Sequence, residues 1–321
     1  MRQALQARAE VLKLARLLHV EPAELEYLVA VPLEDLVALR EAVTEVLFSA
    51  HSGVLTRLVA ASRILPTPVV AAIGERAFGP TLSARVAGLL DPERAVDMAG
   101  RLPTSFLADV AVEIDPRRAS AVLGRIPPEQ VAAITRELVA RGEFVAMGRF
   151  VGHLAPASIA AAVESMDDAS LLRVAFVLES KGTVSELVDL LGPGRAAGTI
   201  AAAAREDLWL EVLDLVSHLE LRQIHPFLEI PQLSEAAVLA RIVAVAREEE
   251  LWPQLLPLVE HLPEAAVASL GQIVGGLGLD PDELDVLRAA GGDAALRSGL
   301  ARLAAAAGLS EQLGLEGASA A

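Results

Sequence analysis

Cysteine is absent from the 321-residue chain, which excludes disulfides, thiolate catalysis and cysteine-based zinc or iron–sulfur sites. Aromatic residues are scarce at 3%, whereas apolar residues make up 53%, and much of that share is alanine. Alanine is the best helix former and lets helix axes approach one another closely. The composition therefore predicts an all-helical protein that is held together by hydrophobic packing.

Long hydrophobic runs are also lacking, although the mean hydropathy of +0.46 is high. The longest stretch without a charged residue or histidine is Ala265–Leu279, which has 15 residues and contains four glycines. A helix needs about 20 apolar residues to span a bilayer. Near the N-terminus, Glu10, Lys13 and Arg16 interrupt any signal-like apolar segment. These features predict a cytoplasmic protein without a membrane span.

Basic residues are fewer than acidic ones: the chain has 27 Lys and Arg residues and 43 Asp and Glu residues, and its net charge is −16. Such a chain repels polyanions, and its basic residues are scattered along the sequence instead of forming runs. We therefore predict no nucleic-acid partner. An alternative interpretation gathers the arginines on one face of the folded chain.

Prolines recur with a rhythm in the first half of the sequence. Between Pro80 and Pro128 one arrives every 11 to 13 residues, at Pro80, Pro92, Pro103, Pro116 and the pair Pro127 and Pro128. Proline is tolerated in the first turn of a helix but not in its interior, so this spacing predicts helices of about eight residues. Helices that short bury their apolar faces against their neighbours in sequence, as in a solenoid of stacked units.

Longer repeats follow from Ile126 and share one register. In each full copy a short charged turn precedes an aromatic residue, and a second apolar segment ends at His-Leu; the copies are residues 140–154, 204–219 and 246–262. A degenerate copy at 180–191 lacks both the histidine and the aromatic residue. The apolar positions of the second segment fall three or four apart, which predicts two helices separated by the charged turn.

The pattern as a whole predicts an all-α fold, a right-handed superhelical array (α-solenoid) of short helices and helical hairpins. No segment shows sustained two-residue alternation, so we expect no significant β-sheet. Four segments follow from the changes in period: an N-terminal helical cap at 1–60, a short-helix array at 61–125, helical-hairpin repeats at 126–290, and a C-terminal helix with a frayed tail at 291–321.

Residues 88 to 165 resemble a known family. The resemblance rests on the runs Leu90–Ala95, Leu102–Thr104, Ile114–Ala119 and Ile126–Val131, which are similar to the intracellular N-terminal domain of MgtE-type magnesium transporters. In that family the domain is a superhelix of short helices that lies beside CBS domains and a membrane pore and helps to close the pore when magnesium is plentiful. Because this chain shows neither companion, the resemblance implies an interaction module without transport.

Three histidines recur at matched repeat positions, His153, His218 and His261. Stacked repeats separate equivalent positions by about 10 Å per helix, too far to share one zinc ion at bonds of about 2.0 Å. The favoured interpretation is that each histidine caps a helix C-terminus, where positive charge is stabilising; the alternative is one edge that binds a ligand.

Aromatic residues and a methionine supply the other candidates for a binding surface. They are Phe144, Met147, Phe150, Phe176, Trp209 and Trp252. Aromatics at matched repeat positions are typical of the packing between units, and the alternative is a ligand groove or an apolar cavity.

Three other motifs favour structural roles. Asp167-Asp168 is typical of a helix N-terminus, and Leu171 stands where a magnesium-binding DDxxD run needs its last aspartate. Gly192–Gly198 follows a helix and not a strand, so it predicts a helix stop and restart and not a phosphate loop. Asp280–Asp285 is a capped helix start, since a calcium loop needs other residues there.

No nucleophile elbow, HExxH pair or Walker-type lysine loop is present, so we predict no enzyme, no cofactor, and neither catalytic nor metal-binding residues. The leading hypothesis is a non-catalytic α-helical repeat protein that binds a protein partner as an interaction or regulatory module. One alternative is a carrier of an apolar small molecule or lipid, favoured by the high hydropathy and small side chains. A second is a regulator that senses divalent cations such as Mg²⁺. The two apolar ends of such an array are also compatible with homo-oligomers.

Overall fold

The computed structural model describes residues 2–18, 20–49, 55, 57, 59–60, 62–178, 180–191 and 195–315. Within these residues all regular structure is helical and no strand occurs, which confirms the all-α prediction. In the same part of the chain, no helix is both long enough and apolar enough to cross a membrane. Gly192–Gly194 of the predicted helix restart and residues 316–321 of the predicted tail lie outside the described residues.

The chain forms two compact units, which we call the N-terminal unit (residues 2–183) and the C-terminal unit (184–321). The division falls inside the segment 126–290 that the repeat pattern marks as one array. The four segments inferred from the sequence period stay predictions.

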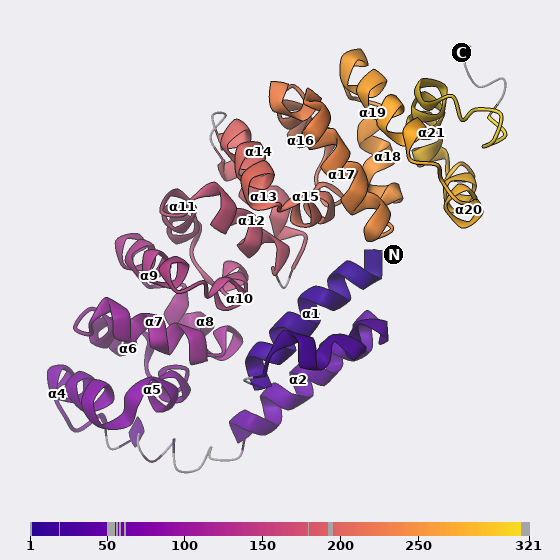
Figure 1. Ribbon diagram of the computed structural model, residues 1–321. Helices are drawn as coiled ribbons and strands as arrows, with labels where there is room; N and C mark the ends of the chain where they lie inside the picture. The colour runs from indigo at the N-terminus through magenta and orange to yellow at the C-terminus, as the bar shows by residue number, and fades with distance from the viewer. Residues whose placement is uncertain are drawn as a thin grey trace. The chain divides into compact units, whose positions relative to one another are not determined.

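A helical hairpin opens the N-terminal unit. Helix α1 (Arg2–Leu18) and helix α2 (Leu33–Ser49) pack side by side and are joined through a 3₁₀ helix, η1 (Pro22–Ala30) (Figure 1). Ala7, Val11 and Leu36 form their buried core, against which apolar residues of the η1 region pack. We call α1, η1 and α2 the N-terminal hairpin.

The rest of the N-terminal unit is a series of short helices, which we call the short-helix array. Its elements are α4 (Thr67–Ile73), the π-helical turn η2 (Gly74–Phe78), α5 (Gly79–Ala87), α6 (Pro92–Ala99), α7 (Thr104–Glu113), α8 (Pro116–Leu123), α9 (Pro128–Ala140), α10 (Phe144–Gly148), η3 (Val151–His153), α11 (Pro156–Glu164) and α12 (Asp168–Phe176). Prolines lie in the first turn of α5, α6, α8, α9 and α11, and Pro103 directly precedes α7, as the sequence predicts. The side chains of Asp91 and Asp115 accept backbone N–H bonds at the starts of α6 and α8.

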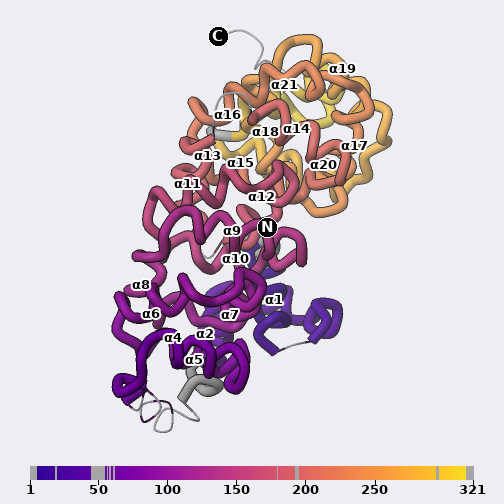
Figure 2. The backbone as a smooth tube through the Cα atoms, turned by 90° about the vertical axis from the view of Figure 1, so that its left-hand side faces the viewer, coloured from indigo at the N-terminus to yellow at the C-terminus, as the bar shows by residue number. Residues whose placement is uncertain are grey.

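Each short helix packs on the helix two places further along the chain. Helix α4 contacts α6 and α6 contacts α8, while α5 contacts α7, α7 contacts α9 and α9 contacts α11. Figure 2 shows the helices from α4 to α12 following one another in chain order through this unit. Short helices are thereby buried by neighbours that are close in sequence.

A recurring hydrogen bond accompanies this packing. Arg94 Nη2 donates to the carbonyl of Ser62 at 2.7 Å, Gln130 Nε2 to that of Ala99 at 2.8 Å, and Ser158 Oγ to that of Ile126 at 3.1 Å. The sequence separations are 32, 31 and 32 residues. Ser62 and Ala99 end helical segments, where the last carbonyls lack partners within the helix. Ile126 lies in the loop before α9, so Ser158 binds a loop carbonyl.

The C-terminal unit continues with helices that pack in the same alternating way. Its elements are α13 (Thr183–Leu190, which begins at the division), α14 (Arg195–Glu206), α15 (Trp209–Val216), α16 (Leu221–Leu228), η4 (Pro231–Ser234), α17 (Ala236–Glu248), α18 (Trp252–Val259), α19 (Glu264–Gly276), α20 (Pro281–Ala290) and α21 (Ala294–Ala307). Helix α14 contacts α16, α15 contacts α17, α17 contacts α19, and α19 contacts α21.

The three charged turns of the repeat copies share one backbone conformation. Each contains a residue in the left-handed region: Gly142 (φ 71°), Asp207 (φ 55°) and Glu250 (φ 55°). In each turn the next backbone N–H donates to the carbonyl five residues earlier, at 2.6 to 3.0 Å. This is a common way to end a helix. The turns separate α9 from α10, α14 from α15 and α17 from α18, as the register of the copies predicts.

Glu250 holds a conformation that costs a side-chain-bearing residue about 1 to 2 kcal/mol. We expect Glu250→Gly to raise the free energy of unfolding of the C-terminal unit by about 0.5 to 1 kcal/mol, after the entropy cost of glycine. Its neighbour Glu249 has φ −106°, so Glu249→Gly relieves no strain and should be destabilising. Urea unfolding of both variants tests this, and equal shifts of the two midpoints would contradict it.

Gly299 marks a close approach between α21 and α18. A Cβ atom at Gly299 would lie 1.9 Å from the carbonyl oxygen of Leu256, whereas one at Gly276 in α19 would meet nothing within 4 Å. We expect Gly299→Ala to lower the free energy of unfolding by about 3 kcal/mol or more, because backbone must move. Gly276→Ala should leave it unchanged or raise it by about 0.5 kcal/mol. Thermal unfolding of the pair measures the difference, and similar melting temperatures would refute the close contact.

Candidate functional site

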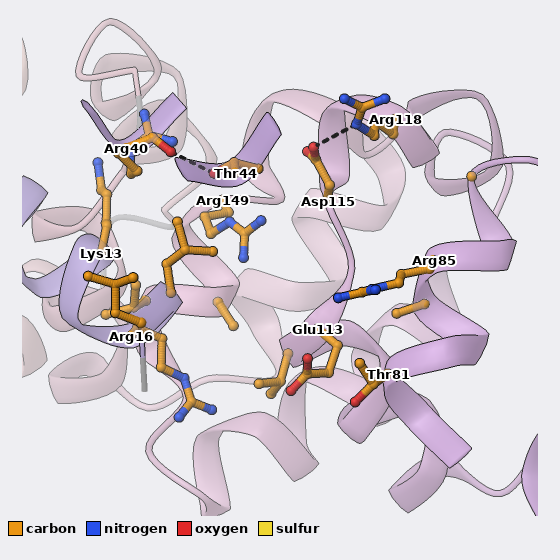
Figure 3. Close-up of a pocket in the computed structure, with 17 residues that line it drawn as sticks. Lys13, Arg16, Arg40, Thr44, Thr81, Arg85, Glu113, Asp115, Arg118 and Arg149 are labelled. Atoms are coloured by element: carbon orange, nitrogen blue, oxygen red, sulfur yellow. Dashed lines mark hydrogen bonds and ion pairs between the residues drawn. The ribbon is translucent and has the colours of Figure 1, made fainter. Parts of the chain in front are cut away.

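A cavity of about 590 Å³ lies in the N-terminal unit and is lined mainly by α1, α2, α5, α7, α8 and α10. Six of its lining residues are basic: Lys13, Arg16, Arg40, Arg85, Arg118 and Arg149 (Figure 3). Two are acidic, Glu113 and Asp115, and several others, such as Leu17, Val112 and Val145, are apolar. We call this cavity the basic pocket. Its volume is in the range of sites that bind small molecules or short segments of chain.

The basic side chains come from two walls. Lys13 and Arg16 lie one turn apart on α1, and Arg40 is on α2, so the N-terminal hairpin forms one wall. Arg85 on α5, Arg118 on α8 and Arg149 directly after α10 belong to the short-helix array, which forms the other. We call these the hairpin wall and the array wall. An apolar cluster in which Ala9 of α1 meets Phe176 and Val177 joins the two parts.

Lys13 and Arg40 share one buried carboxylate. Lys13 Nζ lies 2.7 Å from Glu10 Oε1, and Arg40 Nε lies 2.8 Å from Glu10 Oε2. The three side chains are only 3 to 10% exposed, and Lys13 also donates to the carbonyl of Leu178 at 3.4 Å. Burial alone would raise the pKa of Glu10, but the charges and hydrogen bonds of Lys13 and Arg40 outweigh it and hold that pKa below its ordinary value. Lys13 and Arg40 thus lie on either side of one buried carboxylate.

The other basic residues differ in what they bind. Arg16 Nη2 lies 2.7 Å from Glu143 Oε1, Arg118 Nε lies 3.4 Å from Asp115 Oδ2, and Arg149 Nη2 donates to the carbonyl of Ile114 at 3.1 Å. Arg85 makes no hydrogen bond or ion pair with any residue that the structure describes. Figure 3 shows the guanidinium groups of Arg85 and Arg149 both extending into the pocket.

Basic side chains thus outnumber carboxylates in the pocket of a chain whose net charge is −16. A concave surface lined by one sign of charge focuses its field on the opening. Five of the six basic residues are arginines, whose planar guanidinium groups bind carboxylate or phosphate through two parallel hydrogen bonds. Chemically, the arrangement suits an anion with more than one charged group.

Within the described residues, no group of three or more His, Asp or Glu side chains lies close enough together to hold a metal ion. Comparisons of the chain with protein-family models, with curated proteins and with solved structures found no match. The resemblance to the MgtE N-terminal domain stays a prediction.

None of the candidate binding residues of the N-terminal unit is among the residues that line the basic pocket. Met147, Phe150 and Phe176 are buried, and Phe150 packs in a core cluster with residues of α8. Phe144 is half-buried at the start of α10, where the guanidinium carbon of Arg173 lies 5.6 Å from its ring centre. His153 is half-buried in η3.

In the C-terminal unit, Trp209 and Trp252 are each 2% exposed and occupy the first positions of α15 and α18. His218 Nδ1 lies 2.9 Å from the carbonyl of Asp214 in the last turn of α15, which agrees with the helix-capping interpretation. His261 is exposed. The burial of both tryptophans favours packing over ligand contact, and a binding role for any of these residues stays a prediction.

Two of the motifs with a structural interpretation do cap helices. The side chain of Asp167 accepts a bond from the backbone N–H of Ser170 at 2.8 Å, and that of Asp280 accepts one from Glu283 at 2.8 Å. Both aspartates therefore satisfy backbone donors in the first turn of a helix, as predicted.

Sequence reasoning did not single out the basic pocket. Arg85, Arg118 and Arg149 are separated by 33 and 31 positions, close to the period of the recurring hydrogen bonds between helices. That spacing is the signal that would place these three arginines on one wall. The contribution of the N-terminal hairpin has no comparable signal, because Lys13 and Leu178 are 165 residues apart.

We expect Glu10→Gln to lower the free energy of unfolding by about 3 to 5 kcal/mol near pH 7, because it leaves two buried cations without their anion. Glu26→Gln on exposed η1 is the control and should change it by less than about 0.5 kcal/mol. Urea unfolding measures both.

The effect of Glu10→Gln also depends on pH. Because folding lowers the pKa of Glu10, its charge stabilises the native state fully above about pH 4.5 and the contribution is lost as the pH falls through the folded-state pKa. The difference between the native chain and the variant should therefore shrink on acidification. A difference that stays constant down to about pH 3 would contradict this.

Proposed function

We propose that this chain is a non-catalytic α-helical repeat protein, an α-solenoid of the cytoplasm, that serves as a protein-interaction or regulatory module. In this proposal the basic pocket binds an acidic or phosphorylated segment of a protein partner. The observation that carries the proposal is the convergence of six basic side chains on one pocket in a strongly acidic chain.

Two features support the repeat architecture. Helices pack on the helix two places along in both units, and side chains donate to backbone carbonyls 31 or 32 residues earlier in the short-helix array. Units that contact mainly their neighbours are typical of solenoids, which present extended surfaces to other proteins.

The chemistry of the pocket supports an anionic peptide as the ligand. Clusters of arginine are a recurring means of binding phosphorylated and acidic motifs. Arg85 and Arg149 offer donors from the array wall, and Arg16 offers them from the hairpin wall. Leu17, Val112 and Val145 supply apolar surface for the aliphatic parts of such a segment. A positively lined pocket favours neither an apolar cargo nor Mg²⁺, so the carrier and the cation sensor stay predictions from the sequence.

Peptide binding tests the proposal. We expect fluorescence anisotropy to show binding of a labelled eight-residue peptide rich in glutamate, tighter binding of a phosphoserine version, and none of a peptide with the acids replaced by glutamine. Affinity should fall as salt rises, since the attraction is between charges. Arg85→Gln and Arg149→Gln should each weaken binding about tenfold, the size expected for one charged hydrogen bond.

Arg101→Gln is the matched control. Arg101 is exposed and lies 2.9 Å from Asp97 on α6, and it does not line the pocket, so affinity should stay within about twofold of the native value. Equal binding of the neutral peptide would overturn the proposal. So would unchanged affinity in a folded Arg85→Gln/Arg149→Gln double variant.

A further inference from the structure

The basic pocket lies between two parts of the N-terminal unit, the N-terminal hairpin and the short-helix array. The N-terminal hairpin has a buried core of its own, and the short-helix array has another, in which Ala84, Ile114 and Phe150 pack together. Each part contributes three basic residues to the cavity.

Some of the contacts between the two parts are polar. Arg16 of α1 lies 2.7 Å from Glu143, and Glu41 of α2 lies 3.1 Å from Arg117 of α8. The side chains of the second pair are 40 and 51% exposed, so this ion pair contributes little to docking. Lys13 of α1 also donates to the carbonyl of Leu178 at 3.4 Å. The cluster of Ala9 with Phe176 and Val177 adds an apolar contact.

Both walls bring basic groups to the cavity. Arg85 and Arg149 approach the cavity from the array wall, while Lys13, Arg16 and Arg40 line it from the hairpin wall. Carboxylates offset part of this charge, and the excess of basic groups remains. An anion held between the walls attracts the basic groups of both and therefore bridges them.

We propose that an anion with at least two charged groups clamps the N-terminal hairpin onto the short-helix array, so that occupancy of the basic pocket controls how firmly the hairpin is docked. This inference rests on the proposed function and adds a consequence to it. A ligand that bridges both walls binds only the docked state and stabilises that state by mass action. By linkage, a docked hairpin raises the affinity for the anion by the same factor.

The experiment follows docking directly. The chain has no cysteine, so cysteines introduced at exposed Glu26 in η1 and exposed Glu129 in α9 carry spin labels on the hairpin and on the array. Pulsed electron–electron distance measurements compare inorganic pyrophosphate, the acidic peptide, and acetate at matched ionic strength. Hydrogen exchange of α1 and α2 gives a second readout without labels.

We expect pyrophosphate and the acidic peptide to narrow the distribution of distances between the two spin labels, and acetate to leave that distribution unchanged. Exchange in α1 and α2 that requires undocking should slow by a factor of one plus the ligand concentration divided by its Kd, or about 100-fold at 100 times Kd. Both effects should be lost in Arg85→Gln/Arg149→Gln and retained in Arg101→Gln.

Binding of either ligand without a change in distance or in exchange would overturn the clamp while the proposed function stands. The same would follow from equal narrowing in the double variant, which would show a general effect of ions. Failure of both the peptide and pyrophosphate to bind would overturn the proposed function together with the clamp.

Discussion

Helices of about eight residues are too short to persist alone in water, and this constraint governs both units of the protein. Stability has to come from burial against helices nearby in sequence and from partners for the carbonyls that each short helix leaves unpaired. Arg94 of α6 donates to the carbonyl of Ser62, and Gln130 of α9 donates to that of Ala99 at the end of α6. A helix that packs against one earlier helix can therefore also supply a donor for the terminal carbonyl of another.

The features predicted correctly from the sequence depend on residues that are close together in the chain. Proline at a first turn and aspartate at a helix start act within four residues, so Asp91, Asp115 and Asp280 were found from their neighbours alone. The basic pocket depends on contacts such as that of Lys13 with Leu178, which no local pattern encodes. The tryptophans show the same limit, because their repeat position was visible while their burial had to come from packing.

The charge around the basic pocket differs in sign from the net charge of the chain. Glu10 holds two buried cations on the N-terminal hairpin, and Glu143 and Asp115 bind two further arginines of the pocket. The excess of acid lies elsewhere in the chain. A net charge of −16 therefore describes how the molecule repels polyanions at long range, while the chemistry of the pocket is set by which side chains two neighbouring walls bring together.

The recurring hydrogen bonds of the short-helix array use three different donors, the guanidinium of Arg94, the amide of Gln130 and the hydroxyl of Ser158. Any residue that places a donor at that point of the period does the same work. Successive parts of the short-helix array can therefore differ in the donor residue and still form the same bond. The donors Arg94, Gln130 and Ser158 lie 36 and 28 positions apart (130 − 94 and 158 − 130), so the same kind of bond is kept although the spacing between its donors varies.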